Sequence, residues 1–280
     1  MRPETTGIVP GASAWPADPG QARERRHARD RLDVRLLGGV SAVWRGSAVQ
    51  PTSRGSTALL AVIALQRLPR SRETIAVDLW PEAGAATSAT WLRQALWQLR
   101  RAFAGAGADP DRLLEVDADR IGLGPDVELD LDTTRFEALL SARPPRPEEA
   151  LALYHGELAE GLSHDCFVRD RERLTDLYED ALADVGARCL LEGDLECARG
   201  AALRLVHRDP LREEAHATLI EVYGRTGSRS QVSRQYRRLT RILARELGVE
   251  PLAETEQSYR AAMRTTSDRS AARATARGLS

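Results

Sequence analysis

Lysine is absent from this sequence, and all 40 of its basic residues are arginine. A P-loop that binds ATP phosphates needs its lysine, and pyridoxal phosphate needs a lysine to form a Schiff base. The sequence therefore excludes P-loop ATPases and Schiff-base enzymes. A genome that favours arginine codons is the simplest cause of the absence, and the exclusions hold whatever the cause.

Other chemical signals are equally sparse. The three cysteines form no CxxC pair, so we expect reduced thiols in a cytosolic protein. The triplet His164-Asp165-Cys166 lacks a second group of ligands, so we expect no metal site. Nucleophile-elbow and zinc-protease motifs are missing. His207 and His216 fit helix surfaces or helix packing better than acid–base chemistry. We therefore predict neither an enzyme nor a cofactor.

Long hydrophobic runs are missing too. No apolar run approaches the roughly 20 residues of a membrane span, and the N-terminus has no apolar core of a secretory signal. We therefore expect a cytoplasmic protein with no membrane partner. With 280 residues and a formal net charge of −1, the chain predicts two domains, and any basic surface must be local. Residues 1–30 and 267–280 are rich in small and polar residues, and we predict that both are disordered.

The stretch ATWLRQALWQLRRAF (89–103) predicts a helix with an unusual polar side. At 100° per residue, Leu92, Leu96, Leu99 and Phe103 share one narrow arc, which is a core face. The opposite side carries no acidic residue. Its outward stripe consists of Thr90, Gln94, Trp97 and Arg101, flanked by Arg93, Gln98 and Arg100.

A solvated helix usually mixes charges of both signs, because oppositely charged pairs four residues apart stabilise it. This helix carries positive charge and amides only. Arginine and glutamine hydrogen-bond to base edges in the major groove, and arginine also binds phosphates. The stripe is therefore either a DNA-reading face or a surface on which Trp97 packs against a neighbouring element. We expect Ser88 to cap the start of this helix.

The segments around this helix predict a recognisable order of elements. Short apolar runs at 32–50 predict small antiparallel strands, and 53–67 and 71–80 predict two helices. After the arginine-bearing helix, strands near 113–116 and 120–123 predict a hairpin. Sheet, three helices and hairpin in this order indicate a winged helix-turn-helix, in which the third helix reads DNA and the hairpin is the wing.

The predicted wing is acidic. Residues 54–101 carry seven arginines and three acidic residues, whereas 109–137 carry three arginines and ten acidic residues. We expect Arg120 near the wing tip, where such folds reach a phosphate or the minor groove. Asp117 and Asp119 lie beside it, and negative charge repels phosphates, so this wing is a poor phosphate clamp.

The C-terminal half is predicted to be helical throughout. It follows residues 142–149, a Pro- and Arg-rich stretch that we interpret as a linker. Gly193 and Gly227 lie 34 residues apart, the period of tetratricopeptide-type repeats, which bind partners on a concave face. The second unit matches poorly, so an ordinary helical bundle remains an alternative. Candidate helices are about 147–159, 166–192, 195–207, 211–226, 229–246 and 252–265.

Several motifs together carry a resemblance to known families. LWPEA (79–83) followed by LRQALWQLRR (92–101) resembles the OmpR-like DNA-binding domain of antibiotic regulatory proteins, the SARP type. DPLREEAH (209–216) and ELGVEP (246–251) resemble the bacterial transcriptional activation domain found beside it. The resemblance covers about residues 32–262.

The fold implied by this resemblance is mainly α. It comprises a winged helix-turn-helix, with a small antiparallel sheet and a hairpin wing, followed by an all-α domain similar to tetratricopeptide repeats. The implied boundaries are 31–141 for the DNA-binding domain, 142–149 for the linker and 150–266 for the activation domain.

The resemblance also implies a transcription factor with an output domain of the two-component type. Such proteins bind double-stranded DNA at direct repeats beside the −35 region, as homodimers on DNA, and recruit RNA polymerase holoenzyme. They often activate a gene cluster for antibiotics or other secondary metabolites. The implied DNA contacts are Thr90, Arg93, Gln94, Trp97, Arg100 and Arg101, with Arg120 from the wing. The implied polymerase contact is the loop between the second and third helices, with Pro81, Glu82 and Thr87.

Two further hypotheses remain open. The acidic wing and near-zero net charge favour a protein-interaction adaptor whose DNA binding is vestigial. A repressor with the same DNA chemistry is equally compatible with the residues, because the position of the operator decides the sign of regulation.

Overall fold

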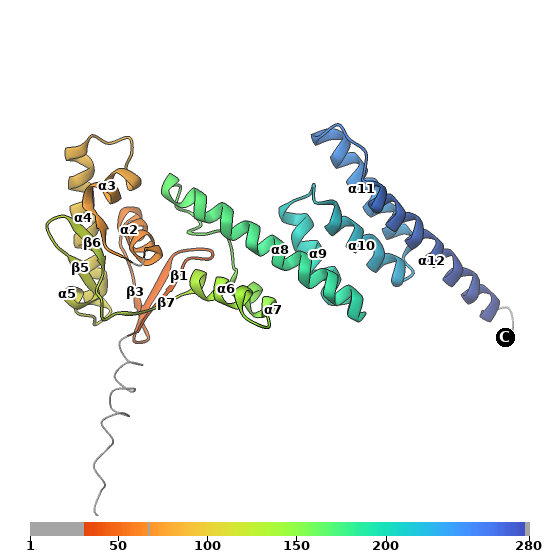
Figure 1. The fold of residues 1–280 in the computed structure, drawn as a ribbon, viewed down its shortest axis with the longest axis horizontal. Helices are drawn as coiled ribbons and strands as arrows, with labels where there is room; N and C mark the ends of the chain where they lie inside the picture. The colour runs from red at the N-terminus through yellow and green to blue at the C-terminus, as the bar shows by residue number, and fades with distance from the viewer. Residues whose placement is uncertain (1–30, 67, 278–280) are drawn as a thin grey trace, which may run out of the picture. The chain divides into compact units, whose positions relative to one another are not determined.

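The computed structural model describes residues 31–66 and 68–277, with side chains up to Ser267. The predicted disordered segment 1–30 lies outside the described residues. The described chain divides into two compact units, whose elements are labelled in Figure 1. The first unit comprises 31–34, 41–75 and 85–130, and the second comprises 35–40, 76–84 and 131–277.

The first unit begins with the small antiparallel strands that the sequence predicts. The strands are β1 (Arg31–Arg35), β2 (Ser41–Trp44) and β3 (Ser47–Val49), and β7 (Glu128–Leu131) completes the sheet in the order β3-β2-β1-β7. Trp44 pairs with Ser47, so only Arg45 and Gly46 connect β2 to β3. Both have positive φ, 46° and 86°, as a two-residue hairpin turn requires.

Three helices follow, as predicted. They are α2 (Arg54–Leu65), α3 (Arg72–Leu79) and α4 (Ala85–Gly105). The Ser53 hydroxyl caps α2 by accepting a hydrogen bond from the backbone N–H of Ser56 at 3.2 Å. The apolar arc of α4, including Leu92, Leu99 and Phe103, is buried, and α4 packs on α2. The predicted core face is therefore confirmed.

The predicted start of α4 is wrong. The helix begins at Ala85, so Ser88 lies inside its first turns instead of capping it. The buried Ser88 hydroxyl donates a hydrogen bond to the backbone oxygen of Ala85 at 3.1 Å. Alanine has the highest helix propensity, which favours the longer helix through Ala85 and Ala86.

The predicted hairpin is present. A short helix, α5 (Pro110–Leu113), leads into β5 (Leu114–Val116) and β6 (Arg120–Leu123), and β4 (Arg70–Ser71) pairs with the far edge of β6. A Cβ atom at Gly122 would lie 2.8 Å from the Cα of Pro69, so glycine is required where the chain before β4 crosses β6.

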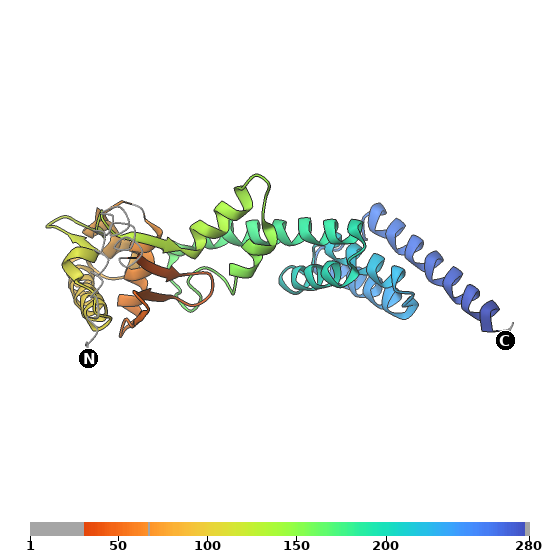
Figure 2. The same ribbon diagram turned by 90° about the horizontal axis from the view of Figure 1, so that it is seen from below.

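The second unit is helical, which confirms the mainly α class. Its elements are α6 (Asp132–Ser141), α7 (Pro147–Leu153), a 3₁₀ turn η1 (Asp165–Phe167), α8 (Val168–Glu192), α9 (Leu195–Arg208), α10 (Glu213–Arg225), α11 (Arg229–Glu246) and α12 (Ala253–Arg277). Helices α8, α9, α10 and α11 pack in sequence, and α12 covers α10. Figure 2 shows α6 and α7 beside the long α8.

Two boundaries differ from the sequence-based expectation. The helix predicted over 147–159 ends at Leu153, because 155–160 turns back to hydrogen-bond with residues 36–38. The tail predicted to be disordered from residue 267 continues α12 as far as Arg277. The boundaries 31–141, 142–149 and 150–266 remain predictions. The chain passes between the compact units for the last time at Asp130–Leu131.

The repeat glycines end helices as expected. Gly193 caps α8 with φ of 83°, and Gly227 follows α10 with φ of 78°, so both adopt the left-handed conformation that glycine tolerates. His216 is buried, which fits the predicted packing role. Its Nε2 donates to the backbone oxygen of Pro210, its Nδ1 accepts from Gln235, and burial lowers its pKa.

The expected reduced state of the cysteines is wrong for one pair. Cys189, near the end of α8, and Cys197, in the first turn of α9, form a disulfide with Cα atoms 5.9 Å apart. The tight turn at Gly193 brings the two helix ends together, which the spacing in sequence did not indicate. Cys166 is free.

A buried carboxylate anchors residues 36–38 in the second unit. Asp132 accepts hydrogen bonds from the backbone N–H groups of Leu36 and Leu37 at 2.9 Å. Burial raises the pKa of Asp132, against these hydrogen bonds, which lower it. The backbone N–H of Gly38 also donates to the oxygen of Glu157 at 2.9 Å.

Candidate nucleic-acid interface

The outward face of α4 is a continuous exposed stripe. Thr90, Gln94, Trp97 and Arg101 are all exposed and lie within about 60° of helix circumference. The buried arc lies on the opposite side of the helix. Since the stripe spans three helical turns without an acidic residue, its chemistry is that of arginine, amide, hydroxyl and indole groups.

Trp97 does not pack into the body of the first unit. Its side chain is 56% exposed, and the guanidinium of Arg101 lies 5.0 Å from the ring centroid. This cation–π contact orients both side chains outward. Together they border a hollow of about 370 Å³ between α4 and the end of β3. The hollow is lined by Ala48, Gln50, Thr52, Trp97, Gln98, Arg101, Ala102 and Gly105.

The start of the stripe is also held in place by hydrogen bonds. The Thr90 hydroxyl donates to the backbone oxygen of Ala86 at 2.9 Å and accepts from Nη2 of Arg93 at 2.8 Å. Arg93 is therefore oriented before any partner arrives. A side chain already ordered loses less conformational entropy on binding.

Arg100 differs from the other predicted contacts. It is only partly exposed and forms an ion pair with Asp111 of α5. The structure therefore separates Arg100 from the exposed stripe, and a phosphate would have to compete with this carboxylate.

Two residues outside the predicted set bear on the face. Trp91 is 43% exposed and lies about 100° around α4 from Thr90. Gln98 accepts a hydrogen bond from the hydroxyl of Ser53 and so ties α4 to the cap of α2. Helical periodicity places Trp91 about 60° outside the stripe. The contact of Gln98 depends on a residue 45 positions away in the sequence.

The tip of the β5–β6 hairpin is organised by an acidic residue. Oδ1 of Asp117 accepts hydrogen bonds from the backbone N–H groups of Asp119 at 2.7 Å and Arg120 at 2.6 Å. These hydrogen bonds lower the pKa of Asp117. Arg120 is exposed, but a carboxylate fixed in its charged form lies beside it.

The predicted polymerase-contact residues do not all lie on one loop. Pro81 and Glu82 are exposed on the connection 80–84, which the backbone hydrogen bond from Ala83 to Trp80 tightens at 3.1 Å. Thr87 lies instead in the first turn of α4, because that helix begins earlier than predicted. The segment 76–84 belongs to the second compact unit.

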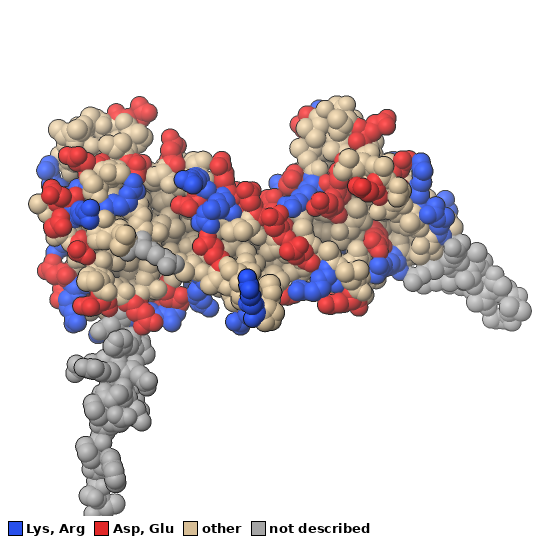
Figure 3. Space-filling model, in the orientation of Figure 1, with Lys and Arg blue, Asp and Glu red and all other residues tan. Residues whose placement is uncertain are grey.

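The described residues outside this face offer no metal site and no membrane-spanning helix. Figure 3 shows acidic and basic side chains interspersed over the face that it presents. Among the described residues, no three His, Cys, Asp or Glu side chains are grouped to hold a metal ion. No described helix combines the length and apolar character that crossing a membrane requires.

Comparison with known proteins adds a family match. The model of the family described as "Bacterial transcriptional activator domain" matches residues 131–263. The transcriptional regulatory protein EmbR of Mycobacterium tuberculosis is 28% identical over 240 residues, which cover 79% of this chain and 60% of EmbR. The regulatory protein DnrI of Streptomyces peucetius is 27% identical over 256 residues, which cover 83% of this chain and 92% of DnrI.

A solved structure shares the fold. Mycobacterium tuberculosis EmbR in complex with a low-affinity phosphopeptide has a TM-score of 0.61 with 22% identity, covering 89% of this chain and 71% of that chain. In the sequence comparison, the chain spans 60% of the length of the curated EmbR protein. The fold shared with this EmbR structure is a small sheet-containing N-terminal part followed by a multi-helix part.

Proposed function

We propose that this chain, a bacterial transcriptional regulator of the SARP-like kind that carries a bacterial transcriptional activator domain, binds promoter DNA through the outward face of α4. Its relatives are named as a transcriptional regulatory protein, EmbR, and a regulatory protein, DnrI. In this proposal the first unit is a winged helix-turn-helix, α4 is its reader helix and the β5–β6 hairpin is its wing. The helices of the second unit form an activation domain similar to tetratricopeptide repeats.

The exposed stripe of α4 is the observation that carries the proposal. Gln94 and Arg93 have the donors and acceptors that read base edges in the major groove, and Arg101 suits a phosphate or a guanine. Trp97 offers an apolar surface to a thymine methyl group. The hydrogen bond between Arg93 and Thr90 and the stacking of Arg101 on Trp97 support a face prepared for a partner.

The wing has a smaller role in this proposal. Arg120 and Arg100 remain candidate phosphate contacts, but each lies beside a carboxylate, Asp117 and Asp111 respectively. We assign sequence reading to Thr90, Arg93, Gln94 and Trp97, and phosphate binding to Arg101.

A genome-wide footprint of the purified protein on sheared genomic DNA tests the proposal. The wild type is compared with the triple variant Arg93→Ala/Gln94→Ala/Arg101→Ala. A matched control is Arg199→Ala/Gln257→Ala/Arg260→Ala, which removes the same side-chain types from one partly exposed position of α9 and two exposed positions of α12. We expect direct-repeat sites that disappear in the α4 variant and persist in the control. Sites that survive the α4 variant would show that this helix does not read DNA.

The regulated step is transcription initiation in the cytoplasm. We propose that copies bind direct repeats beside the −35 region as homodimers and recruit RNA polymerase holoenzyme, with Pro81 and Glu82 as contacts. The targets in this proposal are genes for secondary metabolites. Transcription of a footprinted promoter in vitro, with and without the protein, separates an activator from a repressor by the sign of the change.

The acidic hairpin favours one second candidate, a protein-interaction adaptor with vestigial DNA binding. Asp117 is held in its charged form at the hairpin tip, where DNA-binding folds usually approach phosphates. A pull-down that keeps its protein partners after nuclease treatment, from cells without promoter enrichment of the chain, would support the adaptor over the regulator.

A further inference from the structure

Helix α11 carries an unusual concentration of positive charge. Residues 229–245 include six arginines and no acidic residue. Arg234, Arg238 and Arg241 are all exposed and lie within about 60° of helix circumference. We call these three residues the arginine ridge. It extends about 10 Å along the helix axis, since each residue adds roughly 1.5 Å.

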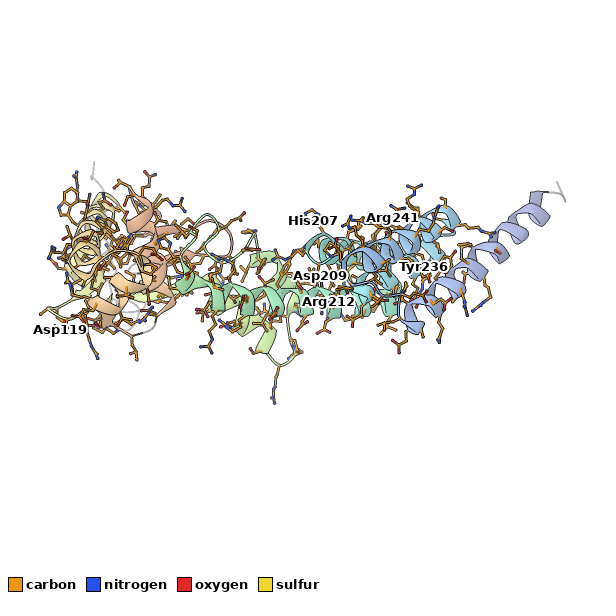
Figure 4. All side chains as sticks on the ribbon, turned by 90° about the horizontal axis from the view of Figure 1, so that it is seen from above. Asp119, His207, Asp209, Arg212, Tyr236 and Arg241 are labelled. Carbon is orange, nitrogen blue, oxygen red and sulfur yellow. A yellow bond between two sulfur atoms is a disulfide. The ribbon has the colours of Figure 1, made fainter. Side chains whose placement is uncertain are left out.

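The ridge faces away from the packed side of its helix. Val232, Leu239 and Leu243 are buried on the opposite side, and Tyr236 stacks on Tyr259 of α12. Figure 4 labels Arg241 and Tyr236 on different sides of α11. The core of the second unit therefore does not require arginine at the ridge positions.

The ridge arginines have no acidic partner among the residues whose side chains the structure describes. In contrast, Arg173, Arg199 and Arg260 on other helices of the same unit each pair with a carboxylate three or four residues away. Like charges spaced by three or four residues repel along a helix. Arg234, Arg238 and Arg241 are spaced in this way, so the ridge destabilises α11 unless an anion binds it.

The first unit supplies little net attraction for DNA. Its segments 31–34, 41–75 and 85–130 contain 11 arginines and 10 acidic residues, which leaves a net charge of only +1. Most of the affinity of DNA-binding proteins for the duplex comes from neutralised phosphates. The exposed stripe of α4 offers few arginines for that purpose, because Arg100 is paired with Asp111.

The surface around the ridge suits DNA better than a protein. Protein interfaces usually centre on exposed aromatic or aliphatic side chains. Within 229–246 no large apolar side chain is exposed, and the ridge is bordered by Ser230, Gln231 and Ala244. Arg245 continues the same face toward the end of the helix, but it is paired with Glu246 and is therefore not counted in the ridge. Guanidinium groups in a polar setting match phosphate oxygens, which they bind in a bidentate manner.

We propose that the arginine ridge of α11 is a second DNA contact, which binds backbone phosphates without reading sequence. The inference rests on the proposed DNA binding by α4 and adds a division of labour to it. The α4 stripe selects the site, and the ridge holds DNA that flanks it.

The test compares the full chain with the variant Arg234→Ala/Arg238→Ala/Arg241→Ala. Its matched control is Arg173→Ala/Arg199→Ala/Arg260→Ala, which removes three arginines that already have acidic partners. Affinity for a long operator fragment and for a scrambled fragment is measured over a range of salt concentrations. Circular dichroism verifies that each variant is folded.

We expect the ridge variant to lose affinity for both fragments by the same factor, so that the preference for the operator is retained. The slope of log K against log salt should become shallower by about 2 to 3, since each lost phosphate contact removes roughly 0.9. The control should keep the wild-type slope. An unchanged slope in the ridge variant overturns the inference, and the ridge is then a solvated face.

Two other outcomes are equally decisive. The ridge variant could keep the wild-type salt slope for DNA and bind RNA polymerase holoenzyme more weakly. That result would show that the ridge binds an acidic protein surface, and it would overturn the phosphate contact. The α4 variant Arg93→Ala/Gln94→Ala/Arg101→Ala separates the two proposals. If this variant keeps its preference for the operator, the proposal that α4 reads DNA is wrong. The salt slope of the ridge variant still tests whether the ridge binds phosphates.

Discussion

Helices α4 and α11 both turn arginines to solvent, but in different ways. On α4 the exposed arginines are held by neighbours, Arg93 by Thr90 and Arg101 by Trp97, and an amide and an indole lie between them. On α11 the ridge contains arginine alone, without acidic partners among the described side chains. Reading a sequence needs oriented groups of several kinds, whereas neutralising phosphates needs only accessible charge. The comparison fits the two proposed roles, in which α4 is a reader of sequence and the ridge of α11 is a clamp on phosphates.

The largest expected effect is a loss of stability when the buried side of either helix is truncated. Leu99 on α4 and Leu239 on α11 are both 0% exposed. Truncation of either to alanine should lower the free energy of unfolding by about 2–5 kcal/mol, because each leaves a cavity in a packed core. Chemical denaturation measures the loss. The control Gln257→Ala should change stability by less than about 0.5 kcal/mol, since that side chain is exposed. Equal losses for Gln257 and the leucines would mean that the buried sides are misplaced.

The next effect separates the two exposed faces. Gln94→Ala should weaken binding to the operator by about 1–3 kcal/mol, because a contact to a base edge is lost, and leave binding to scrambled DNA nearly unchanged. Arg238→Ala should weaken binding to both DNAs by a similar, smaller amount. Titration of each variant with both fragments at one salt concentration measures the difference. If Gln94→Ala weakens both equally, the distinction between reader and clamp fails.

A transcription assay should separate the role of the connection before α4 from the roles of the α4 stripe and the α11 ridge. Reversal of charge at the exposed Glu82, as Glu82→Arg, should lower activated transcription several-fold while DNA binding is retained. The physical reason is a lost contact with polymerase at a residue that lies off the α4 stripe. Transcription in vitro at a saturated operator measures this. A parallel loss of DNA binding would assign Glu82 to the DNA interface instead.

The smallest effect concerns the β5–β6 hairpin. Hydrogen bonds from Asp119 and Arg120 lower the pKa of Asp117 below its unfolded value, so its carboxylate stabilises the fold above that unfolded value, about 3.9. This stabilisation should be lost as the pH falls through the lowered pKa of the folded state. Asp117→Asn should therefore be slightly less stable than the wild type at pH 7, and the difference should vanish at strongly acidic pH. A difference that is constant with pH would exclude a role for the charge.

Much of this architecture could be predicted from local patterns. The apolar arc of α4, the β5–β6 hairpin and helices α8 to α11 follow from periodicity and turn residues, which act over a few positions. The outward orientation of Trp97 was open at the level of sequence, since packing against a neighbouring element was the alternative interpretation. Its exposure and its contact with Arg101 are tertiary findings.

What the sequence could not provide were the partners of individual side chains. The absence of an acid within α4 left Arg100 looking free, but the fold brings Asp111 of α5 against it. In the same way, the spacing of Cys189 and Cys197 gave no reason for a disulfide until the turn at Gly193 joined the two helix ends. The start of α4 at Ala85 also moved Thr87 from a loop into a helix.

The sequence by itself determined most of the helices, though not α6. It also determined the hairpin, the exclusion of lysine-dependent chemistry and the position of the arginine-bearing stripe. These features depend on neighbouring residues or on composition, so they do not depend on how the helices and strands pack together. Only the tertiary structure decided which charges are compensated. Asp111 pairs with Arg100, and Asp132 accepts hydrogen bonds from the backbone of residues 36 and 37. Among the described side chains, the ridge arginines of α11 have no acidic partner. Charge pairing depends on groups distant in sequence, and folding alone brings them within reach.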